Sequence, residues 1–215
     1  MKRTIFFVLI FWAAVSAFAQ VNLPEHRFAS GAWTIAGSRV YQNDTKARLA
    51  KVNLRVAQNG PMLYEFDVRY EDGAEDGHGG FGIHIFADTV YNGASWGCGN
   101  SYLLWLNYDE NPRNPAIPKG FSAQIYRSRT NSRMDLVDSI DINEYAESYL
   151  LGALDNPIPV KIHADGNTGE VRVYDPSDPE GEIYYFFTVD QKDIPLKGNW
   201  AAVRTNGIKL SFATE

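Results

Sequence analysis

Cysteine is almost absent from this 215-residue chain, which contains Cys98 and no other. An intramolecular disulfide needs two thiols, so the fold has to be stabilised by a conventional hydrophobic core. The chain is long enough to bury a core of that kind in one β domain of sandwich size. In this setting the lone thiol is expected to be a small buried apolar residue.

Basic residues are also scarce. Lysine and arginine together number 20 against 26 aspartates and glutamates, which gives a formal net charge of −6. Proteins that grip a phosphate backbone do so with clustered basic side chains, so we do not expect nucleic acid as a partner.

Long apolar runs are missing except at the start of the chain. The first residues, MKRTIFFVLIFWAAVSAFAQ, combine a basic start, an apolar run and an Ala-Phe-Ala site. This pattern is typical of a secretory signal peptide and not of a membrane-spanning helix. We therefore predict a signal peptide over 1–19, an N-terminal extension over 20–32 and one domain over 33–215. The mature protein is expected in the periplasm or outside the cell, without membrane insertion.

Helical periodicity is nearly absent too. The exception is INEYAESYLLG, with Asn143 as a candidate N-cap and Gly152 closing the helix. The rest shows short runs of Val, Ile, Tyr, Phe and Trp between turn residues, which indicates strands. The expected fold is an all-β, two-sheet antiparallel jelly-roll sandwich. The predicted strands cover 33–42, 48–57, 62–71, 80–87, 102–109, 122–128, 134–139, 159–164, 170–174, 183–189, 200–204 and 208–213.

Turn residues and strand polarity add detail to this fold. Asn59-Gly60 predicts a tight hairpin, and HADGNTG predicts a second hairpin between PVKIHA and EVRVY. The runs SYLLWLNYD and IYYFFTV are apolar on both sides. Such strands are expected at the centre of a sheet, with the second face covered by loops or lining a concave surface where function would be found.

Several of these segments together resemble a known superfamily. They are MLYEFDVRYEDG followed by GGFGIHIFAD, then the hairpin VKIHADGNTGEVRVY and the closing GIKLSFAT. In this order they resemble the concanavalin A-like lectin/glucanase jelly rolls of the laminin-G and laminarinase kind, from Trp33 to the C-terminus. The resemblance implies the fold, and it makes glycan binding or glycan hydrolysis functions to be tested.

The hydrolase interpretation depends on carboxylates of one strand. Laminarinase-type enzymes carry E-x-D-x-E or E-x-D-x-x-E, and here Glu65 and Asp67 match only the first half, because the next acid is Glu71. Glu65 and Glu71 are separated by about 20 Å of strand, whereas hydrolytic pairs need about 5–9.5 Å. Glu65 and Asp67 remain the catalytic candidates, but their alternation with apolar residues favours a solvated strand face.

A second catalytic pattern is GASWG, which fits G-x-S-x-G with Ser95 as the nucleophile and His163 later in the chain. A nucleophile elbow lies on a strand-to-helix turn. The residues after Gly97 instead enter a strand, so we interpret the match as a coincidence within a glycine-rich loop.

The loop DGAEDGHGG contains enough acid to suggest calcium. It fails the EF-hand template, since Ala74 and Ile83 stand where oxygen ligands belong. A calcium site of another kind remains an alternative, because lectin-like sandwiches often hold calcium on loop carboxylates. The candidate ligands are Asp72, Glu75, Asp76 and Asp88, and no other cofactor is expected.

The segment YNGASWGCGNSYLLWLNYD concentrates aromatic and amide side chains. Aromatic rings stack on the apolar faces of sugars, while amides bond hydroxyl groups, although the same rings when buried would be core. Trp96 lies among glycines and is the ring most expected to be exposed. The candidate ligand-binding residues are Trp96, Trp105, His84, Asn107 and Tyr91.

Three functions follow for testing. The first is an exported, non-enzymatic protein that binds glycan or a cell-envelope protein. The second is a structural component of an extracytoplasmic assembly, such as the sheath of a periplasmic flagellar filament. The third is a glycoside hydrolase with non-standard carboxylates.

Overall fold

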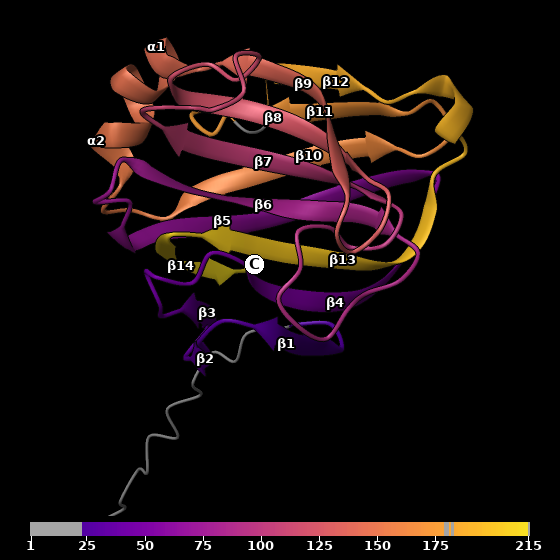
Figure 1. The fold of residues 1–215 in the computed structure, drawn as a ribbon, viewed down its shortest axis with the longest axis horizontal. Helices are drawn as coiled ribbons and strands as arrows, with labels where there is room; N and C mark the ends of the chain where they lie inside the picture. The colour runs from indigo at the N-terminus through magenta and orange to yellow at the C-terminus, as the bar shows by residue number, and fades with distance from the viewer. Residues whose placement is uncertain (1–22, 179–180, 182, 215) are drawn as a thin grey trace, which may run out of the picture.

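A computed structural model describes residues 23–178, 181 and 183–214, and the expected signal peptide lies outside them. In this part of the chain two seven-stranded antiparallel sheets lie as two layers (Figure 1). The first sheet has the order β1-β4-β13-β6-β7-β8-β9, and the second has the order β12-β11-β10-β5-β14-β3-β2. The all-β, two-sheet antiparallel sandwich predicted from the sequence is confirmed.

The strand bounds follow the two sheets. The first sheet contains β1 (His26–Ser30), β4 (Ala50–Asn59), β6 (His78–Ala87), β7 (Ser101–Asp109), β8 (Gly120–Ser128), β9 (Met134–Asp141) and β13 (Lys197–Asn206). The second contains β2 (Trp33–Ala36), β3 (Arg39–Gln42), β5 (Pro61–Gly73), β10 (Ile158–Asp165), β11 (Glu170–Tyr174), β12 (Ile183–Thr188) and β14 (Ile208–Ala213). The short helical segments are α1 (Asn143–Tyr145), the π-helical η1 (Ala146–Leu150), α2 (Leu151–Ala153) and the 3₁₀ turn η2 (Gln191–Asp193).

The N-terminal region differs from the sequence expectation. β1 pairs with β4, so the sandwich begins at His26, within the segment expected to be an extension. The strand predicted over 33–42 is a hairpin of β2 and β3, which turns at Gly37 with φ of +59°. Glycine adopts this left-handed conformation without the penalty that a side chain would bring.

The two turn predictions have opposite outcomes. The hairpin of β10 and β11 is confirmed. The tight hairpin at Asn59-Gly60 is wrong, because β4 and β5 belong to different sheets and the chain crosses between the layers there. Gly60 has φ of +69°, so the residue pair supplies a sharp turn but not a strand pairing.

The predictions for the two strands that are apolar on both sides have different outcomes. β7 lies between β6 and β8 near the centre of its sheet, as predicted. β12 is an edge strand, so the prediction for IYYFFTV is wrong. Phe187 packs in the core while Phe186 is 62% exposed, so the second side of β12 faces solvent at Phe186.

The core lies between the sheets and follows the alternation seen in the sequence. Tyr64 and Val68 of β5 are buried, as are Ile83 and Ile85 of β6, whereas Glu65 and its parity partners face outward. In the described residues no helix is both long and apolar enough to cross a membrane.

The helical segment covers one end of the sandwich and buries Ala146 and Leu150 (Figure 1). Its N-cap position is Ile142, not Asn143 as predicted. The Asn143 side chain instead accepts a 2.8 Å hydrogen bond from the Phe121 amide and donates one of 2.8 Å to the Lys119 carbonyl. It therefore ties the segment to the start of β8.

Gln58 joins the two layers through buried hydrogen bonds. Its Oε1 accepts from the Phe86 amide at 2.8 Å and from the Tyr64 hydroxyl at 2.5 Å, and its Nε2 donates to the Trp200 carbonyl at 2.6 Å. Phe86 has φ of +54°, an unfavourable conformation for a bulky residue. Gln58 thus links β4, β13 and β6 to β5 and fixes a strained residue at the end of β6.

Replacing Gln58 with leucine should therefore destabilise the fold. Three buried polar groups lose their partner, and each unsatisfied group costs about 1–3 kcal/mol, so we expect a loss of about 3 kcal/mol or more in the free energy of unfolding. Urea denaturation measures it, with the exposed neighbour Asn59→Leu as the control. A loss no larger than that of the control would contradict this role.

Candidate functional site

The side of the first sheet that is turned away from the second sheet, here called the outer face, is covered by polar and aromatic side chains. The register places Lys51, Arg204, Gly82, Trp105 and Gln124 in one row across β4, β13, β6, β7 and β8. All five positions are buried although they point away from the core between the sheets. Other side chains and loops therefore cover this face.

Trp105 lies flat on the outer face because the neighbouring strand has no side chains beneath it. A Cβ atom on Gly80 would lie 2.7 Å from Cζ2 of the indole, and one on Gly82 would lie 2.9 Å from Cε3. Its Nε1 donates a 3.0 Å hydrogen bond to Oδ1 of Asn107. The indole thus extends over β6 towards β13.

Arg204 of β13 stands against two tryptophans. Its guanidinium carbon is 5.0 Å from the ring centroid of Trp96 and 5.1 Å from that of Trp105, distances at which a cation is attracted to an aromatic face. Its Nη1 donates to the Trp96 carbonyl at 2.8 Å. The side chain is buried, and this burial lowers its pKa to about 10.

The loop over 88–100 crosses this face and is anchored from below by β4. Lys51 Nζ donates to Ser95 Oγ and to the Gly97 carbonyl, the latter at 2.7 Å. Asn53 Nδ2 donates to the Tyr91 carbonyl at 3.2 Å. Burial lowers the pKa of Lys51 to about 8, against a smaller rise caused by nearby Cys98.

The structure brings the five predicted ligand-binding residues to this one side of the sandwich, at two depths. Trp96 and Tyr91 of the loop are 54% and 50% exposed, respectively. Trp105 and Asn107 are buried beneath, and His84 has no exposed surface and bonds Ser101 Oγ through Nδ1 at 3.0 Å. A ligand on the surface would therefore meet Trp96 and Tyr91 first, whereas the other three residues are covered.

Sequence reasoning missed Arg204 and Lys51. Both are single charges within otherwise uncharged strand segments, AAVRTNG and LAKVNL. A lone cation inside such a strand has to find partners on the sheet, since buried charge is costly. That pattern is the signal that could have identified them.

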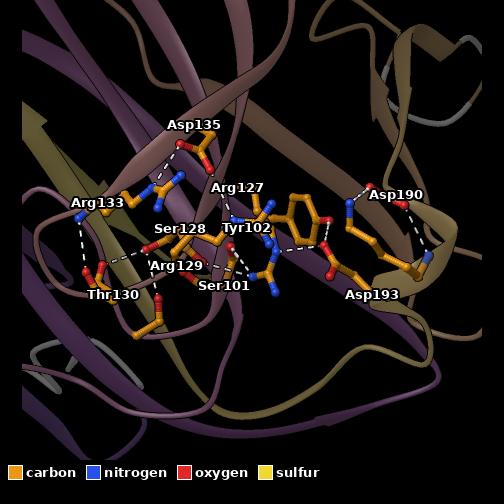
Figure 2. Close-up of polar contacts among 12 residues, drawn as sticks. Ser101, Tyr102, Arg127, Ser128, Arg129, Thr130, Arg133, Asp135, Asp190 and Asp193 are labelled. Atoms are coloured by element: carbon orange, nitrogen blue, oxygen red, sulfur yellow. Dashed lines mark hydrogen bonds and ion pairs between the residues drawn. The ribbon is translucent and has the colours of Figure 1, made fainter.

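A second polar region lies at the end of the sandwich (Figure 2). Asp193 Oδ2 accepts a 2.6 Å hydrogen bond from the Tyr102 hydroxyl and a 2.7 Å bond from Arg127 Nε, and the guanidinium of Arg127 lies 4.9 Å from the Tyr102 ring. These residues line a pocket of about 290 Å³ together with Asp88 and Asn100. The network attaches η2 to β7 and β8.

The catalytic candidates lie on the outside of the second sheet, each beside its own cation. Lys161 Nζ is 3.7 Å from Glu65 Oε1, and Asp67 pairs with Arg39. The two carboxylates thus form part of a charged strand surface, as the alternation favours.

Ser95 and His163 do not meet. Ser95 is buried against Lys51 on the outer face of the first sheet, whereas His163 belongs to β10 of the second sheet and alternates with the core residue Ile162. The two side chains therefore lie on opposite sides of the sandwich.

The four carboxylates that are the candidate calcium ligands do not lie together at one site. Asp72 pairs with Lys209 at 3.1 Å beside the start of β6, whereas Asp88 follows the far end of β6 and accepts from Asn100 at 2.8 and 3.0 Å. Ten strand residues separate these ends, a span of about 33 Å. Across the described ranges no three His, Cys, Asp or Glu side chains are grouped closely enough to hold a metal ion.

Comparison with known proteins identifies the fold. No family model and no curated protein sequence matches the chain. Among solved structures, the metal-free exoplasmic/lumenal domain of VIP36 superposes with a TM-score of 0.52 at 11% identity, over 88% of this chain and 84% of that one. The legume lectin-like domain from Entamoeba histolytica gives 0.51 at 10% identity, over 87% and 86%.

A Bacillus subtilis protein of unknown function with a galectin-like fold gives 0.50 at 14% identity, over 88% of this chain and 86% of that one. At these identities the likeness establishes the fold alone. The chain has the concanavalin A-like lectin jelly roll that its sequence resembles.

The buried Lys51 ammonium predicts an unusual pH dependence of stability. Its pKa is about 8 in the folded chain and about 10.5 when unfolded, so the unfolded state binds more protons between these values and stability rises with pH there. Relative to Lys51→Met, the wild type should gain about 1 kcal/mol between pH 8 and pH 9. Urea denaturation at the two pH values measures this gain.

The exposed Lys46→Met provides the control for this experiment and should behave like the wild type. If the free energy of unfolding changes with pH in the same way for the wild type and Lys51→Met, the Lys51 ammonium is not desolvated.

Proposed function

We propose that this chain is an exported, non-enzymatic glycan-binding protein, which contacts its ligand with the loop over 88–100 on the outer face of the first sheet. The observation that carries the proposal is the exposed indole of Trp96, which is held against Arg204 by a stacked contact and by its own carbonyl. A rigid, exposed aromatic face is suited to the apolar side of a sugar ring.

Hydroxyl groups on the same outer face would supply the polar part of sugar recognition. The exposed Tyr91 belongs to the same loop, and Tyr126, which donates to Gln124 Oε1 at 2.6 Å, lies half-buried on the same outer face. Hydroxyl and amide groups beside an aromatic ring favour glycan over a purely apolar ligand. The lectin-like domains that share this fold support glycan binding over the assembly and hydrolase functions.

Replacing Trp96 with alanine should abolish or weaken glycan binding by about tenfold or more, because the stacking surface is lost. Stability should change little, since the ring is largely exposed. Binding is measured on an array of envelope and plant-type glycans and then by calorimetry, with calcium and with a chelator. Phe186→Ala is the matched control, an exposed aromatic residue of the second sheet.

Trp105→Ala is a poorer test, because the buried indole covers Gly80 and Gly82 and its removal would disturb the sheet itself. If the wild type binds no glycan and self-associates in solution, the assembly function replaces the proposal. If glycans are cleaved and Glu65→Gln or Asp67→Asn stops the cleavage, the hydrolase function replaces the proposal.

A further inference from the structure

The space between the two sheets is not completely filled at the end that the helical segment covers (Figure 1). A cavity of about 100 Å³ lies there, and a second of about 90 Å³ adjoins it. Both are lined by Val68, Phe81, Leu106, Leu150 and Ile158. Because they have these walls in common, the two are lobes of one space, here called the inner cavity.

Six side chains of the larger lobe show that it is accessible. They are Phe66, Phe81, Leu106, Val160, Val173 and Tyr185. The alternation of their strands directs all six towards the core, yet they are only partly buried, whereas inward-facing neighbours such as Ile83 and Ile162 are buried. The lobe is neither sealed nor a flat depression, and the partly exposed Tyr174, Pro176 and Tyr184 line its mouth.

The lining of the inner cavity is apolar. None of the described residues that line either lobe carries a charge. Tyrosines line the larger lobe, and burial raises the pKa of the Tyr185 hydroxyl, as expected for a group with little water around it. Apolar cavities of about 150 Å³ stay dry and take up benzene or xenon, because water needs several polar partners. The inner cavity is therefore suited to an apolar guest.

The mouth of the larger lobe is acidic. Burial raises the pKa of Tyr184 to about 12, and the nearby carboxylates of Asp175, Asp141 and Glu144 add to this rise. The ammonium of Lys161 lies over another ring of the mouth, but it is paired with a carboxylate of β5 at 3.7 Å. A negatively charged head group would therefore be repelled at the entrance.

We infer that the inner cavity binds the hydrocarbon chain of a small amphiphile whose head group is uncharged. This second ligand site is independent of the proposed glycan contact, which lies on the outer face of the first sheet. Two adjoining lobes suit an extended chain, and the acidic mouth disfavours a fatty-acid anion. Leu150, which lines both lobes, belongs to the π-helical η1, and such turns are rare and frequently found at functional sites.

The test titrates the mature chain with straight-chain alcohols from 1-butanol to 1-decanol by calorimetry. Burial of each further methylene should tighten binding about fourfold until the cavity is full, after which the affinity should level off. Each alcohol should also bind about fivefold or more tightly than the carboxylate of the same chain length at pH 7, because the mouth is acidic.

Val160→Phe places a larger side chain in the inner cavity and should weaken alcohol binding about tenfold or more. Val137→Phe is the matched control, since it makes the same change at an exposed position of the edge strand β9. It should leave the affinity unchanged. If Val160→Phe does not fold, Val173→Phe fills the same lobe from β11, and the levelling of affinity in the wild type needs no variant.

The outcomes decide the inference without reference to glycans. Absence of alcohol binding would overturn it, and so would an affinity that rises with every added methylene and is the same in Val160→Phe, since the chain would then lie on the outer surface. Carboxylates that bind as tightly as the alcohols would overturn the uncharged head group. Trp96→Ala should bind alcohols like the wild type, so failure of the glycan proposal is seen separately.

Discussion

The outer face of the first sheet depends on one close approach, that of the Trp105 indole to the backbone of β6. Side chains at 80 and 82 would occupy the volume of the ring, so glycine is required at both positions. With the indole flat on the sheet, Arg204 finds an aromatic surface beside it and Trp96 closes over the guanidinium. Two glycines thus make room for the indole beside which Arg204 and Trp96 are stacked.

The outer face of the first sheet differs from the usual antiparallel sheet, whose polar side faces water. Here the polar side carries Lys51, Arg204 and His84 under cover, and their bonds go mostly to neutral groups. Such an arrangement is costly for stability, because charged and polar groups lose their contact with water. The apolar core on the opposite side of the same sheet, with Ile83, Ile85 and their neighbours, compensates for that cost.

Much of the fold could be predicted from the sequence because period-two alternation and turn residues are local signals. Alternation in β5 correctly separated Tyr64 from Glu65. Sheet membership is a long-range property, and this is why Asn59-Gly60 suggested a hairpin where the chain crosses between layers. The edge position of β12 was missed for the same reason. The sequence pattern of an apolar strand is the same whether its second side is covered or exposed.

The site was predictable in part for a related reason. Aromatic and amide clustering identified Trp96, Trp105 and Asn107, which the structure places on one face, but composition could not distinguish the exposed Trp96 from the buried Trp105. Their connection is Arg204, which lies 108 residues after Trp96 and contacts it only because β13 pairs with β6 in the folded sheet. The spacing of Trp96 and Trp105 in the sequence does not indicate that a cation lies between them. The position of Arg204 in its strand is explained only by the loop that covers it. The chemistry of this face therefore originates in strand order rather than in any single motif.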